Sequence, residues 1–170
     1  AAVRHVARIK NVWLLGFLYF GVGGCLQGLL GYLPLSLRGL GWEAIRADGV
    51  MSAFHTISLV FVLPIALCSD RLCSRKPLLS IAAIMIALGT GLVSFASGGL
   101  IWVAVLIGGF VRDALMAVLF TTVIEVKGVG PVYAGTAVGL TMALGGFGFI
   151  LAPPIGNSLA SLWPGAPFAF

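Results

Sequence analysis

Residues 49–69 read GVMSAFHTISLVFVLPIALCS, a run of 21 residues without a formal charge, and residues 70–77 continue it as the charged turn DRLCSRKP. A bilayer core about 30 Å thick requires about 20 apolar residues in a helix. In lipid, every backbone N–H and C=O must also bond within the segment. The run therefore predicts one membrane-spanning helix, and the turn predicts its exit into water.

Three more charge-free runs surround this segment, at residues 11–37, 77–111 and 128–170, with lengths of 27, 35 and 43 residues. The 35-residue run is too long for one span, and the turn signal Ser97-Gly98-Gly99 divides it. In the last run, we expect Pro153-Pro154 to break the helix and Gly156-Asn157 to close it. The sequence thus predicts an all-α, polytopic transmembrane helix bundle with spans at about residues 12–36, 49–69, 77–96, 100–124 and 132–155.

The two ends of the chain fall outside the bundle of residues 12–156. Residues 1–11 are expected to form a cytoplasmic basic linker. Residues 157–170, with Pro164 and Pro167, are too short to cross a bilayer. We expect them to form an outer loop and the start of an incomplete sixth helix.

The overall composition agrees with a membrane protein. Apolar residues make up 60% of the chain, charged residues 9%, and the mean hydropathy is +1.13. Soluble domains carry about 25% charge, so this composition excludes a soluble enzyme and a nucleic-acid-binding protein. The expected environment is the lipid bilayer, and the net charge of +5 bears on orientation.

Basic residues are distributed unequally between the two sides of the predicted bundle. Two lie on one side, Arg38 and Arg46. Seven lie on the other side, namely Arg4, Arg8, Lys10, Arg71, Arg75, Lys76 and Lys127. Because Lys and Arg stay cytoplasmic, we expect a multi-pass protein of the plasma (inner) membrane with its N-terminus in the cytosol.

The sequence offers no signal for a metal or a cofactor. Cys25, Cys68 and Cys73 form an odd set, and the last two lack the spacing and the histidine neighbours of a zinc site. No G-x-x-x-x-G-K-[ST] motif for ATP occurs. We expect no cofactor and no bound metal.

The turn at residues 70–77 places its charges unfavourably for its own helices. Asp70 ends one helix, where the dipole is negative, while Arg75 and Lys76 begin the next, where it is positive. Partners from elsewhere should compensate these charges. Glu125, at the cytoplasmic end of the fourth span, is the acidic residue that can reach an arginine of this turn.

The pattern Asp70-Arg71-x-x-x-Arg75-Lys76 resembles the cytoplasmic signature of the major facilitator superfamily, G-x-x-x-D-R-x-G-R-[RK], with Ala66 and Cys73 at its glycine positions. An acidic residue that ends the fourth helix, such as Glu125, is also similar to the family. The fifth span resembles the corresponding helix because it is rich in small residues: Gly135, Gly139, Gly145, Gly146 and Gly148.

The resemblance implies a C-terminal half of such a transporter, with helices seven to eleven, a stub of helix twelve, and a missing N-terminal six-helix half as partner. It implies that Asp70, Arg71, Arg75, Lys76 and Glu125 form a cytoplasmic gate. The alternative is that this basic turn only anchors the topology of the chain.

Four polar residues fall at membrane depth: Gln27, His55, Arg112 and Asp113. Arg112 is at the middle of the fourth span, about 18 Å from either end, and charged groups in hydrocarbon usually mark a pathway or a site. Because adjacent residues of a helix point about 100° apart, we expect Arg112 and Asp113 not to pair with each other. Arg112 would hold an anionic group of the substrate, and Asp113 would take up a coupling proton.

Structural roles remain open for the same residues. The alternative for Arg112 and Asp113 is a buried structural ion pair with a residue of another span. The alternative for His55 is a packing role in which its ring is hydrogen-bonded. Gly135 and Gly139 predict a face for close helix packing.

The leading hypothesis is a secondary transporter, not an enzyme, that moves a small polar solute, with an anion favoured by Arg112, by alternating access with proton coupling or exchange. The alternative is a membrane-embedded auxiliary subunit or an intramembrane enzyme.

Overall fold

The computed structural model describes residues 2–71, 75–162 and 166–168. In these residues the chain is helical, without strands, and five helices are long and apolar enough to cross a membrane. The predicted all-α fold, with five helices of membrane-spanning length and hydropathy, is therefore confirmed. The elements are α1 (Ala2–Val6), α2 (Lys10–Gly39), α3 (Ala44–Asp70), α4 (Lys76–Val93), α5 (Leu100–Glu125), α6 (Gly130–Ala160) and the 3-10 turn η1 (Ala166–Phe168).

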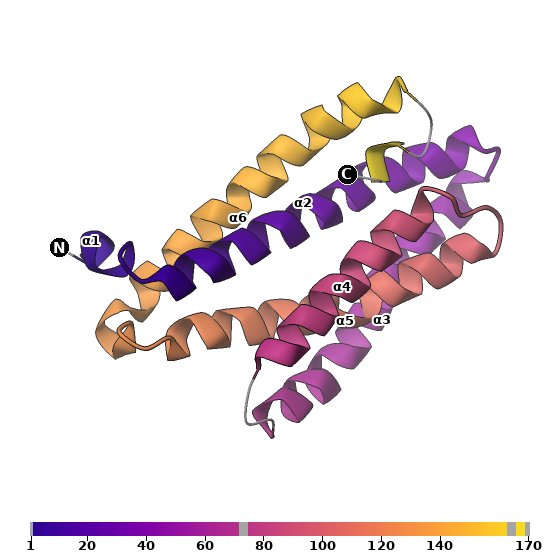
Figure 1. The fold of residues 1–170 in the computed structure, drawn as a ribbon. Coiled ribbons are helices and arrows are strands. Elements are labelled where there is room, and N and C mark those ends of the chain that lie inside the picture. The colour runs from indigo at the N-terminus through magenta and orange to yellow at the C-terminus, as the bar shows by residue number, and fades with distance from the viewer. Residues whose placement is uncertain (1, 72–74, 163–165, 169–170) are drawn as a thin grey trace.

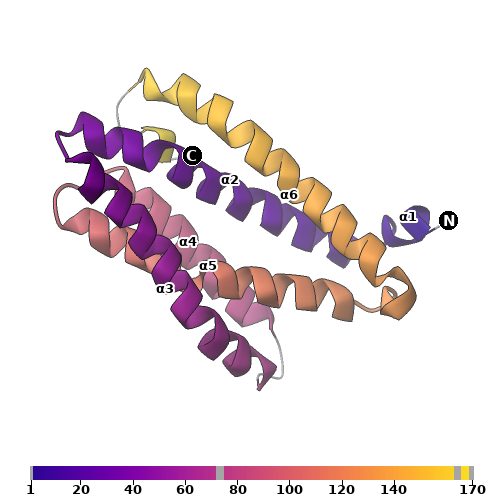
Figure 2. The ribbon, with the colours of Figure 1, turned by 180° about the vertical axis from the view of Figure 1, so that it is seen from behind.

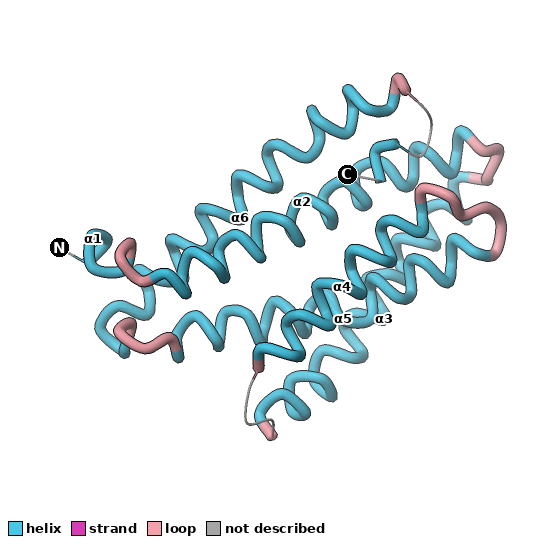
Figure 3. The backbone as a smooth tube through the Cα atoms, viewed as in Figure 1, coloured by secondary structure: helices cyan, strands magenta, loops and turns pink. Residues whose placement is uncertain are grey.

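The five long helices are arranged as a pair and a group of three. Figure 1 shows α2 and α6 side by side, and Figure 2 shows the same pair from behind. In the group of three, α5 packs against both α3 and α4. The tube in Figure 3 shows that short turns join α2 to α3 and α4 to α5 at one end of the molecule.

The prolines of α6 do not end the helix, which continues to Ala160 instead of stopping near residue 155. A proline removes one backbone N–H, but its fixed φ is itself helical, so the helix can continue through Pro153 and Pro154 with two backbone donors missing. The Tyr32 hydroxyl of α2 donates to the Pro153 carbonyl over 2.9 Å, and the Ser158 hydroxyl donates to the Pro154 carbonyl over 2.9 Å. The first of these bonds ties α6 to α2 at the prolines.

The close contact between α2 and α6 is not at the predicted glycines. A Cβ added at Gly145 would meet the ring of Tyr19, and a Cβ added at Gly148 would meet the backbone of Phe20. Gly135 and Gly139 are exposed, with no heavy atom of the described chain within 4 Å of an added Cβ.

The reason for this difference is helical phase. The buried stripe of α6 comprises Ala137, Thr141, Gly145, Gly148, Ala152 and Gly156. Gly135 lies about 200° around the helix from Ala137 at 100° per residue. Among the described residues, no helix packs closely against Gly135 and Gly139, contrary to what their spacing predicts.

Both ends of the chain fold onto the bundle. At the N-terminus, Val6 is fully buried, and His5 Nε2 lies 2.9 Å from the carbonyl oxygen of Gly128 in the turn between α5 and α6. The residues expected as a linker thus dock on that turn.

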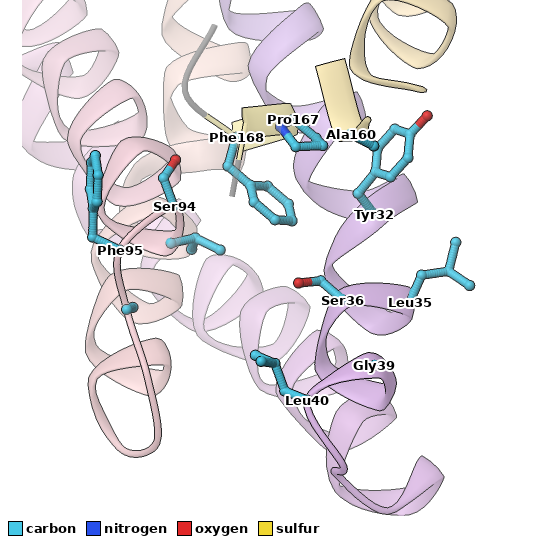
Figure 4. A pocket seen from close by; sticks show the side chains of 12 residues that line it. Tyr32, Leu35, Ser36, Gly39, Leu40, Ser94, Phe95, Ala160, Pro167 and Phe168 are labelled. Atoms are coloured by element: carbon cyan, nitrogen blue, oxygen red, sulfur yellow. The ribbon is translucent and has the colours of Figure 1, made fainter. Parts of the chain in front are cut away.

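At the other end of the membrane span, η1 packs against α2 and α6. Phe168 and Pro167 line a 430 Å³ cavity with Tyr32 and Ser36 of α2 and Ser94 after α4 (Figure 4). Residues 166–168 therefore form a 3-10 turn at the position where the sequence suggested the start of a sixth helix.

Candidate functional site

Two adjacent glycines of α5 bring three helices together near the middle of the membrane span. A Cβ at Gly109 would lie 2.9 Å from both the ring and the backbone oxygen of Phe54 in α3. A Cβ at Gly89 in α4 would lie 2.7 Å from the backbone nitrogen of Gly108. Only glycine permits these approaches, so Gly89 and Gly109 set the distance of α5 from α4 and from α3.

The polar cluster of His55, Arg112 and Asp113 lies one turn along α5 from this crossing. Arg112 Nη1 is 2.8 Å from His55 Nδ1, which connects α5 to α3. The Arg112 guanidinium also lies over the ring of Phe54, 5.6 Å from its centroid, a distance suitable for a cation–π contact. The structure therefore brings together the predicted depth neighbours His55 and Arg112.

Arg112 and Asp113 are closer than the sequence suggested. Arg112 Nη1 lies 3.6 Å from Asp113 Oδ1, which contradicts the expectation that the two residues do not pair. The angular argument holds for the Cβ atoms, but the long arginine side chain allows its guanidinium to bend toward a neighbouring carboxylate. The guanidinium consequently lies between an imidazole and a carboxylate.

Ser58 fixes the backbone beneath this cluster. Its side chain is fully buried, and its hydroxyl accepts a hydrogen bond of 3.0 Å from the backbone N–H of Asp113. Ser58 lies one turn after His55 on α3. These two residues of α3 therefore contact Asp113 and Arg112, two successive residues of α5. A buried hydrogen bond of this kind contributes about 1 kcal/mol.

The cluster is open to its surroundings on one side. The side chains of Arg112 and Asp113 are 23% and 37% exposed, and His55 is exposed. Arg112 and Asp113 lie at the middle of the 26-residue helix α5. A charge at that depth is costly in lipid, so this face must meet water or another protein surface.

Gln27 does not join the cluster. It is half-buried on α2, and it makes no hydrogen bond with His55, Arg112 or Asp113 in the part of the chain that the structure describes. Equal depth in the membrane did not bring it close, because α2 packs mainly against α6 while the cluster spans α3 and α5.

A second charged cluster lies at the predicted cytoplasmic ends of three helices. Arg75 Nη2 donates to Asp70 Oδ1 over 3.1 Å, and Arg75 Nη1 lies 3.1 Å from Glu125 Oε2 as an ion pair without hydrogen-bond geometry. Asp70 ends α3, Glu125 ends α5, and Arg75 is the residue before α4. The predicted pairing of an arginine in this turn with Glu125 is present.

This arrangement explains the unfavourable positions of the charges along the chain. Arg75 is poorly placed for the dipole of α4, but it lies at the negative ends of α3 and α5, where a cation is favourable. Its side chain is 17% exposed, whereas those of Asp70 and Glu125 are 66% and 56% exposed. Arg71 and Lys76 are exposed and form no ion pair with any described residue.

The described residues include no group of three His, Cys, Asp or Glu side chains that could hold a metal ion. Cys25 and Cys68 are free thiols, and Cys73 lies outside the described residues.

Sequence reasoning missed Phe54, Ser58 and the glycines at the crossing. The available signal was the pair Gly108-Gly109 in the middle of a span, separated by two residues from the charged pair Arg112-Asp113. Two adjacent glycines in a helix face different directions, so the pair can contact two neighbouring helices.

Comparison of this chain with protein-family models, with curated proteins and with solved structures gave no match. Its function therefore has to be inferred from the residues and their geometry.

Proposed function

We propose that this chain is a half of a secondary active transporter similar to the major facilitator superfamily, and that it moves a small anionic solute by alternating access. In this proposal a six-helix N-terminal half completes the transport path. The protein lies in the plasma (inner) membrane with its N-terminus in the cytosol. Transport is driven by a proton or by exchange for another anion.

The observation that carries the proposal is the open cluster of His55, Arg112 and Asp113 at membrane depth. A guanidinium in this position costs several kcal/mol if it faces lipid. A purely structural ion pair would be closed off by its neighbours, whereas Arg112 keeps part of its donor surface accessible. A water-filled path that admits an anion accounts for both the cost and the exposure.

The cytoplasmic cluster supports a gate in the same proposal. Arg75 connects Asp70 and Glu125, the last residues of α3 and α5. Movement of these helix ends apart requires Arg75 to release at least one carboxylate. Such exposed pairs are worth about 1 kcal/mol or less, a strength suited to a contact that must form and break in every cycle.

Anion binding tests this function directly. The whole chain would be reconstituted in lipid nanodiscs, and the binding of radiolabelled acetate and inorganic phosphate would be measured by equilibrium dialysis. Arg112→Gln removes the central cation. Arg46→Gln is the matched control, because Arg46 is exposed at the outer end of α3 and makes no ion pair with a described residue.

A charge-assisted hydrogen bond is worth about 1.5–3 kcal/mol, so Arg112→Gln should weaken anion binding about tenfold to a hundredfold. Arg46→Gln should leave it unchanged, and circular dichroism should show the same helicity in all three proteins. Equal binding by Arg112→Gln and the wild type, or no binding of either anion to the wild type, would refute the proposal.

A further inference from the structure

The contact between Arg112 and His55 defines the protonation state of the imidazole. A guanidinium has donors and no acceptor. His55 Nδ1, 2.8 Å from Arg112 Nη1, must therefore accept the hydrogen bond. The ring is then neutral and carries its proton on Nε2. A doubly protonated imidazole would present a donor to a donor, so this contact and a charged His55 exclude each other.

Among the charged groups around His55, the Arg112 side chain is the one that can move away from the imidazole. Of the two helices packed against α3, α5 presents the charged groups Arg112 and Asp113, while α2 gives His55 no hydrogen bond or ion pair among the described residues. Asp113 is held at its backbone by Ser58. The Arg112 side chain, with its several rotatable bonds, can leave His55 Nδ1 without moving either helix.

The net charge of the cluster then couples two binding events. With His55 neutral, the formal charges of Arg112 and Asp113 sum to zero. An anion bound alone would leave one negative charge at membrane depth, and a proton bound alone would leave one positive charge. Each of these states carries the cost of an unpaired charge in a low-dielectric site, whereas an anion and a proton bound together restore a net charge of zero.

We propose that the site takes up its anion together with one proton, and that His55 is the residue that carries the proton. This proposal rests on the transport function proposed above. An oxyanion, such as a carboxylate, replaces His55 Nδ1 as the acceptor of the hydrogen bond from the Arg112 guanidinium. The freed Nδ1 lone pair binds a proton from water, and release of the anion returns the proton to water and Arg112 to His55.

The experiment measures anion binding and proton uptake by the whole chain in nanodiscs. The probe is methanesulfonate, an oxyanion that brings no proton of its own between about pH 5 and pH 8. Proton uptake is followed with an indicator dye in weak buffer, and affinity is followed by dialysis across the same range. His55→Asn keeps an acceptor oxygen near the position of Nδ1 but cannot titrate, and His5→Asn is the matched control.

In the wild type and in His5→Asn, each bound methanesulfonate should bring up to one proton, and the apparent Kd should therefore rise with pH. His55→Asn should bind without proton uptake and with a flat pH profile. If methanesulfonate binds through Arg112 but without a proton, or if His55→Asn keeps the uptake, this inference falls and the anion-binding function stands. If no anion binds to the wild type, both proposals fail.

The imidazole itself gives a second readout. The chain has two histidines, so His5→Gln leaves His55 as the only source of an imidazole ¹⁵N signal. The expected spectrum is that of the neutral Nε2–H tautomer without anion and of a protonated ring with saturating methanesulfonate. A ring protonated on Nδ1 in the anion-free chain would overturn the inference.

Discussion

Replacement of Gly89 by alanine should separate α4 from α5. The added Cβ would lie 2.7 Å from the nitrogen and 2.8 Å from the Cα of Gly108, and 2.9 Å from the oxygen of Ala104. Ordinary carbon contacts are about 3.5–4.0 Å, so the helices must move apart by about 1 Å. All three neighbours are backbone atoms, so no side-chain rotation can relieve the clash.

A displacement of this size has a calculable cost. A gap of about 0.5–1 Å forfeits a quarter to a half of each dispersion contact across the interface. Overpacking of a well-packed core typically costs about 1–3 kcal/mol. The gain in helix propensity from Gly to Ala, about 0.5–1 kcal/mol, offsets part of this. We therefore expect a net loss of about 1–2 kcal/mol for Gly89→Ala.

Gly91→Ala in the same helix is the matched control, because an added Cβ at Gly91 meets no heavy atom within 4 Å. It should leave the free energy of unfolding unchanged or raise it slightly. Both variants would be unfolded in mixed micelles by increasing the mole fraction of SDS, with helicity followed by circular dichroism. Equal unfolding curves for Gly89→Ala and Gly91→Ala would refute the close approach of α4 and α5.

Three further outcomes are expected from the same unfolding assay. Tyr32→Phe removes the donor to the Pro153 carbonyl and should cost about 1 kcal/mol, whereas Tyr133→Phe, whose hydroxyl makes no hydrogen bond with a described residue, should cost less; equal losses would contradict the role of Tyr32. Arg75→Gln should cost about 1 kcal/mol or less at low salt, and a loss that does not shrink at high salt would contradict an ionic origin. Gly139→Ala should raise the stability by about 0.5–1 kcal/mol, because the position is open, and a loss would show that a helix packs there.

The features of this structure that could be predicted from the sequence are those that depend on one segment of the chain at a time. The length of charge-free runs fixed the number of spans, because a bilayer has one thickness, and the turn at residues 97–99 separated α4 from α5 as expected. The approach of Arg75 to Glu125 was also predictable, because both residues had to end on the same side of the membrane.

Features that depend on a neighbouring helix were not predictable in the same way. The hydrogen bond that ties α6 to α2 at Pro153 comes from Tyr32, 121 residues away in sequence. The pairing of Arg112 with Asp113 depends on side-chain rotation that sequence spacing does not describe. The phase of α6, which leaves Gly139 exposed and buries Gly145, is set by the face that α2 contacts.

The two contacts between α3 and α5 lie at different depths, and this difference predicts which end of the pair can open. At mid-depth, Phe54 packs on Gly109 and Ser58 binds the backbone of Asp113. At the C-terminal ends of the two helices, the connection is ionic and passes through Arg75. Loss of Arg75 should therefore release these C-terminal ends while the buried mid-depth contact remains as a pivot.

Spin labels test this expectation in a chain whose three cysteines are replaced by alanine. One pair of labels would replace the exposed residues Leu67 and Ile124 near the C-terminal ends of α3 and α5, and the control pair would replace the exposed residues Ile45 and Leu100 at their N-terminal ends. In Arg75→Gln, the distance distribution of the first pair, measured by pulsed electron resonance, should lengthen or broaden, and that of the second pair should stay unchanged. A change of equal size at both ends would show that α3 moves as a rigid body away from α5 without a pivot at Phe54. No change at either end would show that Arg75 does not hold the helix ends together.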